Sequence, residues 1–365
     1  MKNSLETQYR PDYVVPPGAT IAETIEAFGI SQAELADRLG MSLPTVNKII
    51  KGKAPISPET AIALERVIGI SAGFWNRYEA SYREFLAKQE ETAKLGSLVE
   101  WVKRFPVKDM VKLGMVREQS SPVAQLQELL RFFGIASPNQ WDGMLQVAGA
   151  RYRESKSFER NPAAVAAWLR RGELEAQQIE CEPYDEAKLK RMVPELRALT
   201  LLDAAPMQER LQSICASCGV AVVFVPELPG TKLFGAARWI TPTKALVQLS
   251  LRRKQEDHFW FTFFHELAHI LFHGKRSFFL DEENGLTQSE EENEADAWAA
   301  EVLIPERYLK DFLFSGKPSL LRIERFAREI KIAPGIVVGR LQKLEVLDWS
   351  VGNKLKRTFV WRVEE

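Results

Sequence analysis

The sequence predicts a mostly helical α+β protein whose one small sheet lies in its C-terminal part. Short helical patterns with tight breaks fill the first two hundred residues, β-branched apolar runs begin only after Gly219, and helices follow those runs without regular alternation. A chain of 365 residues is long enough for two or three domains. We expect a small helical domain at 1–80, a helical connector at 81–200 and a sheet-containing domain at 201–365.

The composition indicates a folded, cytoplasmic protein. Hydrophobic residues make up 45% of the chain, and 49 Lys and Arg residues balance 49 Asp and Glu residues, so any nucleic-acid binding must come from a local basic surface. The N-terminus lacks a signal-peptide pattern, and no apolar run approaches the roughly 18 residues that a membrane span needs. Three cysteines are too few for a disulfide framework, so Cys215 and Cys218 are interpreted as buried side chains at a helix end.

The first 80 residues contain two short amphipathic helices that suit nucleic-acid recognition. After a polar arm at 1–18, residues 32–39 and 42–51 have helical periodicity, Gly40 separates them, and Ser42 can cap the second helix. The outward side of that second helix offers hydroxyl, amide and cationic groups, which base edges and phosphates require. A plain helical bundle with a solvated lysine face fits the periodicity equally well. The outward residues are Thr45, Asn47, Lys48 and Lys51.

This part of the chain resembles the Xre/Cro-type helix-turn-helix proteins, particularly the HigA antitoxin branch. The resemblance covers about residues 15–80 and rests on the runs SQAELADRLGMSLPTVNKIIKGK and ISPETAIALERVIGISAGFWNRYEASY. It implies a five-helix domain that binds a double-stranded DNA operator as a homodimer, with the second helix of the motif reading the bases. The contacts implied by the resemblance are Ser42, Thr45, Asn47, Lys48 and Lys51.

The remaining elements follow from periodicity and from breaks in it. Residues 79–97 predict a long polar helix, and helical patterns with many prolines continue to about residue 200 without a motif for chemistry, as in a spacer or an interaction region. The runs VAVVFVP, GAARWI and ALVQLSL predict strands, and TFVWRV predicts a last strand in the tail. Helices are expected at 257–273, 289–303, 320–330 and 334–344.

All four histidines fall on the first of these C-terminal helices, and His265, Glu266 and His269 form an HExxH motif. Histidines four residues apart lie one turn apart on nearly the same helix face, where their imidazoles can hold one metal ion. Glu266 lies beside that face, where it can take a proton from an activated water. A chance pair of helical histidines is the alternative, but a charged Glu266 in so apolar a helix is costly without a purpose.

A catalytic zinc needs a third protein ligand, and the acidic segment SEEENEADAWAAEVLIP at 289–305 supplies candidates. Glu292 and Asp296 lie one helical turn apart, so Glu292 can ligate the metal while Asp296 braces a ligand histidine. Spacing alone leaves Glu290, Glu291 and Glu294 as competing ligands.

The C-terminal region resembles the ImmA/IrrE family of zinc metallopeptidases over about residues 205–345. The matching runs are FTFFHELAHILFH, EENEADAWAAEVLIP and RFAREIKIAPGIVVGRLQKLEVL. The resemblance implies a zincin-like domain in which His265, His269 and Glu292 bind Zn2+ and Glu266 is the general base. Asp296 then supports a ligand histidine, and His273 either assists the site or lies on the surface.

Together these features predict a transcriptional regulator with a zinc-dependent endopeptidase domain. Its expected partners are operator DNA and a protein, either a repressor or antitoxin that it cleaves or a toxin that it binds, with no membrane involved. A peptide substrate is expected to pair with a sheet edge formed by the strand at 233–240 or the strand at 245–250. The alternatives are a HigA-like antitoxin or repressor whose peptidase-like domain senses or binds without turnover, and a peptidase with a protein-binding N-terminus.

Overall fold

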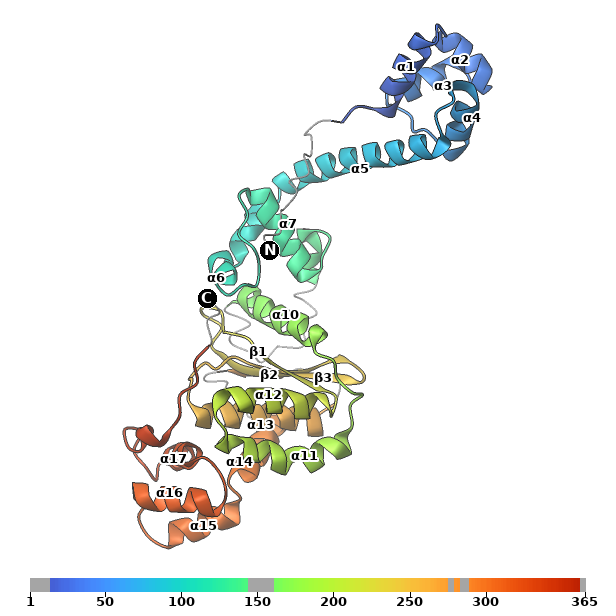
Figure 1. Cartoon of the computed structure of the whole chain (residues 1–365). Helices are drawn as coiled ribbons and strands as arrows, with labels where there is room; N and C mark the ends of the chain where they lie inside the picture. Colours follow the sequence, from blue (N-terminus) through green and yellow to red (C-terminus); the bar gives the residue numbers. More distant parts are fainter. Residues whose placement is uncertain (1–13, 144–160, 275–278, 283–288, 362–365) are drawn as a thin grey trace, which may run out of the picture. The chain divides into compact units, whose positions relative to one another are not determined.

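The computed structural model describes residues 14–143, 161–274, 279–282 and 289–361. The chain divides into two compact units, residues 1–98 and 99–365. The described part is mostly helical and contains one four-stranded sheet, which confirms the predicted fold class (Figure 1). None of its helices combines the length and the apolar character that crossing a membrane would require.

The first unit is a bundle of five helices: α1 (Pro17–Ala27), α2 (Gln32–Leu39), α3 (Leu43–Ile50), α4 (Pro58–Ile68) and α5 (Ala72–Gly96). Serine side chains cap α2 to α5, each accepting a hydrogen bond from the backbone amide three residues later. Because α1 begins at Pro17, the predicted arm at 1–18 is too long, and its residues 1–13 lie outside the described ones. Gly18 lets the first turn of α1 pack closely on α3, since a Cβ there would lie 2.2 Å from the Ile49 carbonyl oxygen.

The second unit begins with short helices around a cluster of aromatic rings. These elements are η1 (Val99–Arg104), α6 (Val107–Lys112), α7 (Pro122–Phe133) and η2 (Pro138–Gln140). Trp101, Phe105, Phe133 and Trp141 pack edge to face or tilted, with ring centroids 4.6–6.4 Å apart. The elements α10 (Pro162–Gln178), α11 (Glu186–Ala198), η3 (Leu199–Leu201) and α12 (Ala204–Ala216) then lead to the sheet.

The sheet contains β1 (Val220–Phe224), β2 (Leu233–Thr241), β3 (Lys244–Leu249) and β4 (Phe279–Glu282) in the order β1-β3-β2-β4. Strands β1 and β3 are parallel, whereas β2 runs antiparallel to both β3 and β4. Both strands that were predicted as candidate edges, β2 and β3, are therefore interior. The edges of the described sheet are β1 and β4, and no sequence pattern predicts β4.

Helix α10 covers one face of the sheet, and α12 and α13 (Glu256–Phe272) cover the other (Figure 1). The Trp168 indole of α10 donates to the Val225 carbonyl at 2.9 Å, and the Gln248 amide of β3 donates to the Trp168 carbonyl at 2.7 Å. Gly172 permits this approach, because a Cβ there would overlap the Gln248 side chain. Part of the expected connector at 81–200 is thus packed directly on the sheet.

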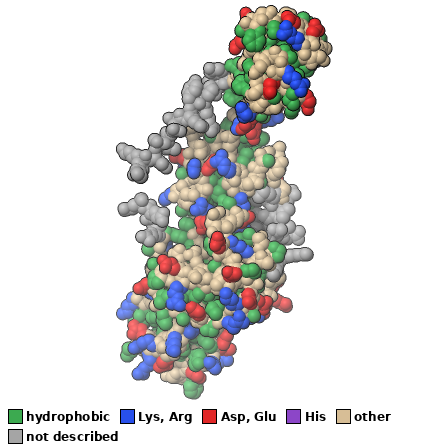
Figure 2. Space-filling model, turned by 45° about the vertical axis from the view of Figure 1, so that its right-hand side comes forward, with side chains coloured by type: hydrophobic (Ala, Val, Ile, Leu, Met, Phe, Trp, Pro, Cys, Tyr) green, Lys and Arg blue, Asp and Glu red, His purple; other side chains and the backbone are tan. Residues whose placement is uncertain are grey.

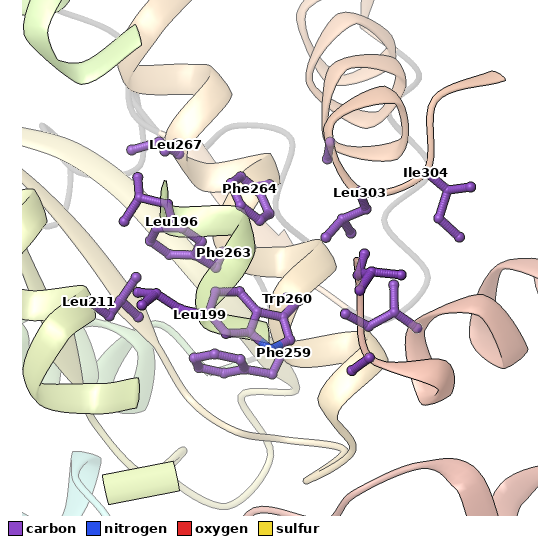
Figure 3. Close-up of a cluster of buried hydrophobic side chains, with 14 of the residues drawn as sticks. Leu196, Leu199, Leu211, Phe259, Trp260, Phe263, Phe264, Leu267, Leu303 and Ile304 are labelled. Carbon is purple, nitrogen blue, oxygen red and sulfur yellow. The ribbon is translucent and has the colours of Figure 1, made fainter. Parts of the chain in front are cut away.

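Helix α13 is buried on almost every side, and it is followed by α14 (Glu290–Leu303), α15 (Glu306–Phe314), α16 (Leu320–Glu329), α17 (Pro334–Lys343) and η4 (Asn353–Leu355). Figure 3 shows Phe259, Trp260, Phe263 and Phe264 of α13 among leucines of α11 and α12 and beside Leu303 and Ile304 at the end of α14. Cys215 and Cys218 are fully buried free thiols, as predicted.

The predicted strand in the tail is wrong for the described residues. Only an isolated bridge joins Thr358 to Gln255, and the chain from 359 to 361 has no regular structure. Ion pairs hold the tail beside α13, since Lys356 pairs with Asp257 at 2.6 Å and Arg357 with Glu256 at 2.5 Å, and backbone hydrogen bonds with Lys254 and Glu256 add to them. These pairs tie the tail to the first turn of α13 rather than along a neighbouring strand.

Candidate metal centre and nucleic-acid interface

Helices α13 and α14 bring together three side chains that can hold one metal ion: His265, His269 and Glu292. The two Nε2 atoms lie 3.0 Å apart, and the Glu292 carboxylate oxygens lie 3.1 Å from His265 Nε2 and 3.6 Å from His269 Nε2. Both imidazoles are at least 95% buried. Two donors on a tetrahedral zinc, each roughly 2.0–2.1 Å from the ion, are about 3.4 Å apart, so this donor set fits a zinc ion.

The protonation states of His269 and Glu292 suit metal binding near neutral pH. Burial lowers the pKa of His269 to about 4, and the neighbouring His265 and His273 reinforce the shift against the opposing effect of Glu292. Burial also raises the pKa of Glu292, but hydrogen bonds with His265 and His269 outweigh this and bring it to about 2. The site therefore presents an uncharged His269 imidazole and an ionised carboxylate.

Each histidine of the pair has a partner for its other ring nitrogen. His265 Nδ1 lies 2.8 Å from Asp296 Oδ1, and His269 Nδ1 lies 2.8 Å from His273 Nδ1. When both Nε2 atoms offer lone pairs, both Nδ1 atoms carry the protons, so His273 accepts through Nδ1 and donates through Nε2. The acceptor is Glu294 Oε2, 3.3 Å from His273 Nε2. Glu294, one of the competing candidate ligands, therefore contacts His273.

Glu266 is fully buried between α13 and the sheet. A Cβ on Gly235 of β2 would lie 2.6 Å from Glu266 Oε1, so only glycine lets the strand pass this close to the carboxylate. Gly235 was not singled out from the sequence, where it reads as one more glycine in a strand. Its importance depends on which residue of α13 faces β2, and one-dimensional periodicity does not give that.

Phe279 of β4 is a second residue that sequence reasoning missed. Its ring stacks on the His269 imidazole, with centroids 3.7 Å apart and an interplanar angle of 12°, and it is 9% exposed. No motif marked it, because it lies in a four-residue strand in a polar surrounding. In this conformation the ring covers one face of the His269 imidazole.

The second candidate site is the exposed surface of α3 in the first unit. Gly40, with φ of 66°, makes the turn between α2 and α3. Ser42 caps α3, and its Oγ contacts Thr45 Oγ1 at 2.8 Å. Asn47 is half-buried, whereas Lys48 and Lys51 are exposed. Figure 2 shows Lys, Arg, Asp and Glu side chains interspersed on the visible face. The two exposed lysines of this surface therefore form a local basic group.

Comparison with known families finds two matches in different parts of the chain. Residues 21–75 match a family model described as helix-turn-helix, and residues 236–342 match a peptidase family model described as the IrrE N-terminal-like domain. The first match contains α2 and α3, and the second contains the candidate metal ligands.

Individual relatives match less than a quarter of the chain. The Escherichia coli K12 protein described as "uncharacterized HTH-type transcriptional regulator YddM" is 32% identical over 82 residues, 22% of this chain and 85% of that protein. Virulence-associated protein A of Dichelobacter nodosus is 37% identical over 59 residues, 16% of this chain and 58% of that protein. Among solved structures, the Pseudomonas aeruginosa antitoxin HigA with the higBA promoter is 34% identical, with 22% of this chain and 88% of that chain covered and a TM-score of 0.21.

Proposed function

We propose that this chain is a DNA-binding regulator with zinc-dependent endopeptidase activity. It belongs to the helix-turn-helix family through residues 21–75 and to the IrrE N-terminal-like peptidase family through residues 236–342. The observation that carries the peptidase proposal is the convergence of His265, His269 and Glu292, with Asp296 behind one ligand. Its substrate is proposed to be a regulatory protein, such as a repressor or an antitoxin.

In this proposal His265, His269 and Glu292 would hold a zinc ion, which would supply Lewis-acid chemistry that favours attack of a water on a peptide carbonyl at neutral pH. Glu266 accepts the proton that this water loses and delivers it to the leaving amine as the C–N bond breaks. Asp296 fixes the His265 ring through Nδ1, and His273 does the same for His269. The burial of Glu266 keeps bulk water from competing for the transferred proton.

The experiment compares the wild-type chain with Glu266→Gln, both purified and shown to hold equal zinc. Each is incubated with candidate repressor or antitoxin partners and with itself, and products are identified by mass spectrometry. We expect cleavage by the wild type alone, because the amide cannot accept the proton. Cleavage that persists in Glu266→Gln would refute the role of Glu266 as general base.

The second candidate function is a regulator whose peptidase-like domain senses metal or binds a partner without turnover. The specific observation in its favour is enclosure of the centre, since Glu266 is fully buried and Phe279 stacks on His269. Zinc-loaded wild type that cleaves none of the candidates but still binds one of them would support this function.

DNA binding through α3 as a homodimer is the other half of the proposal. It rests on the family match, on the relative described as a transcriptional regulator and on the exposed Lys48 and Lys51. The contacts we propose are Ser42, Thr45, Asn47, Lys48 and Lys51. A mobility-shift assay with the chain's own upstream DNA should give binding that weakens steeply with salt. The absence of a shift at low salt would favour a protein-binding role for this unit.

A further inference from the structure

The second unit contains a cavity of about 900 Å³ that the proposed function does not use. Residues of α11, α14, α15 and α16 line it, all of them described, and none belongs to the candidate metal centre. It lies at the opposite end of α14 from Glu292, since Val302 in its wall is ten residues further along the helix, roughly 15 Å along the axis. Its volume is within the range of small-molecule sites, roughly 300–1,000 Å³.

Two arginines hold the walls of this cavity in place. Arg197 of α11 donates to the carbonyl oxygens of Val302 at 2.8 Å, Leu303 at 2.9 Å and Lys331 at 3.1 Å, which joins α11 to the ends of α14 and α16. Arg322 of α16 donates to the carbonyl oxygen of Phe312 at 2.9 Å and to two carbonyls of the following loop. Carbonyls at helix ends lack partners within their helix, so these contacts stabilise a preformed cavity.

The lining of the cavity includes an aromatic pair. The rings of Phe312 and Phe326 stack with centroids 4.6 Å apart at 29°, and each residue is 6% exposed. Val193, Val302 and Ile330 add half-buried aliphatic groups. Such a surface binds the apolar body of a ligand, and its aromatic rings favour a flat one.

The charges that line the cavity are arranged for an anion. Its two half-buried charges, Arg197 and Arg322, are both cations, and two more cations, Arg325 and Lys331, lie on exposed positions. The carboxylates that line it all lie in exposed positions, where water screens them; they are Glu301, Asp311 and Glu329. Among the described residues neither arginine forms an ion pair, and the backbone carbonyls to which they donate carry only partial negative charge.

We propose that this cavity binds a small amphipathic organic anion with an aromatic or flat apolar body. Its apolar part packs on Phe312 and Phe326, and its negative group lies toward Arg322 and Arg325. This binding is independent of the peptidase proposal, because it needs neither a metal ion nor turnover. A ligand there contacts the last turn of the helix whose first turn carries Glu292.

Fluorescence titration of the full-length chain with anilinonaphthalene sulfonate tests the proposal. We expect one saturable site per chain. Val302→Trp should weaken it by placing a larger side chain in the cavity wall, and Arg325→Glu, on an exposed position, should weaken binding about tenfold by reversing one charge. The matched control is Arg328→Glu, which changes an exposed arginine of the same helix that does not line the cavity.

Two further controls separate this cavity from other apolar surface. Leu321, 72% exposed on the same helix, offers the probe a surface patch, so Leu321→Asn should leave binding unchanged. The uncharged analogue N-phenylnaphthylamine should bind at least tenfold more weakly. The proposal is overturned by the absence of saturable binding, by equal weakening in Arg325→Glu and Arg328→Glu, by loss in Leu321→Asn, or by equal affinity for the uncharged analogue.

Discussion

Replacing Asp296 with alanine tests the candidate metal centre without touching a ligand. The carboxylate accepts the Nδ1 proton of His265 over 2.8 Å, so it fixes the ring and makes Nε2 a stronger donor. Removing such a partner typically weakens metal binding 10–100-fold. Because the Asp296 side chain is 60% exposed, water replaces part of the lost interaction. We therefore expect the lower end of that range, about tenfold, or about 1.4 kcal/mol in the free energy of zinc binding.

Competition between the full-length chain and a chromogenic zinc chelator measures this affinity directly, without a substrate. Asp296→Asn should recover part of the loss, since an amide oxygen still accepts the Nδ1 proton. Glu290→Ala is the matched control, because it removes one carboxylate from an exposed position of the same helix. Glu294→Ala should cost less than about threefold, because its weaker contact acts through His273.

The pattern of losses in these variants, compared with Glu292→Ala, decides the interpretation. Equal losses in Asp296→Ala and Glu290→Ala would mean that the general acidity of α14 matters and the contact with His265 does not. Zinc affinity unchanged in Asp296→Ala would refute the supporting role, and a larger loss in Glu294→Ala than in a Glu292→Ala variant would move the third ligand.

Three other predictions follow from particular contacts. The unfolded chain binds a proton at His269 below the ordinary pKa of 6.5, whereas the folded chain does so only below about 4. The free energy of unfolding of the metal-free protein, measured in urea, should therefore fall by about 2 kcal/mol between pH 7 and pH 5. His269→Gln should not show this loss. Gly235→Ala should displace the Glu266 carboxylate and lower the rate of peptide cleavage at least tenfold at unchanged zinc content. Gly96→Ala, where a Cβ meets open space, should leave the rate unchanged. Unchanged cleavage in Gly235→Ala would contradict the role of Gly235 in placing Glu266. Lys48→Ala should weaken DNA binding and reduce its salt slope by about one, and an unchanged slope would place the phosphate contact elsewhere.

The parts of the fold that could be predicted from sequence are those with local causes. Helix α13 was predicted at 257–273 and is found at 256–272, and α14 was predicted at 289–303 and is found at 290–303. Caps, prolines and apolar periodicity fix such boundaries within one turn. The proximity of His265 and His269 is local as well, because it follows from the helical repeat alone.

The parts that could not be predicted have non-local causes. Strand β4 has four residues, and only its pairing with β2 makes it a strand. The role of α10 depends on Gly172 meeting Gln248 across 76 positions of sequence. The aromatic and β-branched residues of the tail predict a strand, but the tail is held beside α13, where it forms two ion pairs. In each case the deciding partner lies far away in the chain.

The choice of Glu292 among four acidic residues shows how the fold adds what spacing lacks. Glu292 and Asp296 lie one turn apart on α14, and they meet the two nitrogens of one imidazole, Glu292 at Nε2 over 3.1 Å and Asp296 at Nδ1 over 2.8 Å. A carboxylate at position 290, 291 or 294 is turned by about 100° or 200° from Glu292, so no other residue of the group pairs with Asp296 in this way. Once one imidazole edge faces α14, the i to i+4 spacing selects both the candidate ligand and its candidate support, and the sequence alone lacks only the rotation of α14 about its axis.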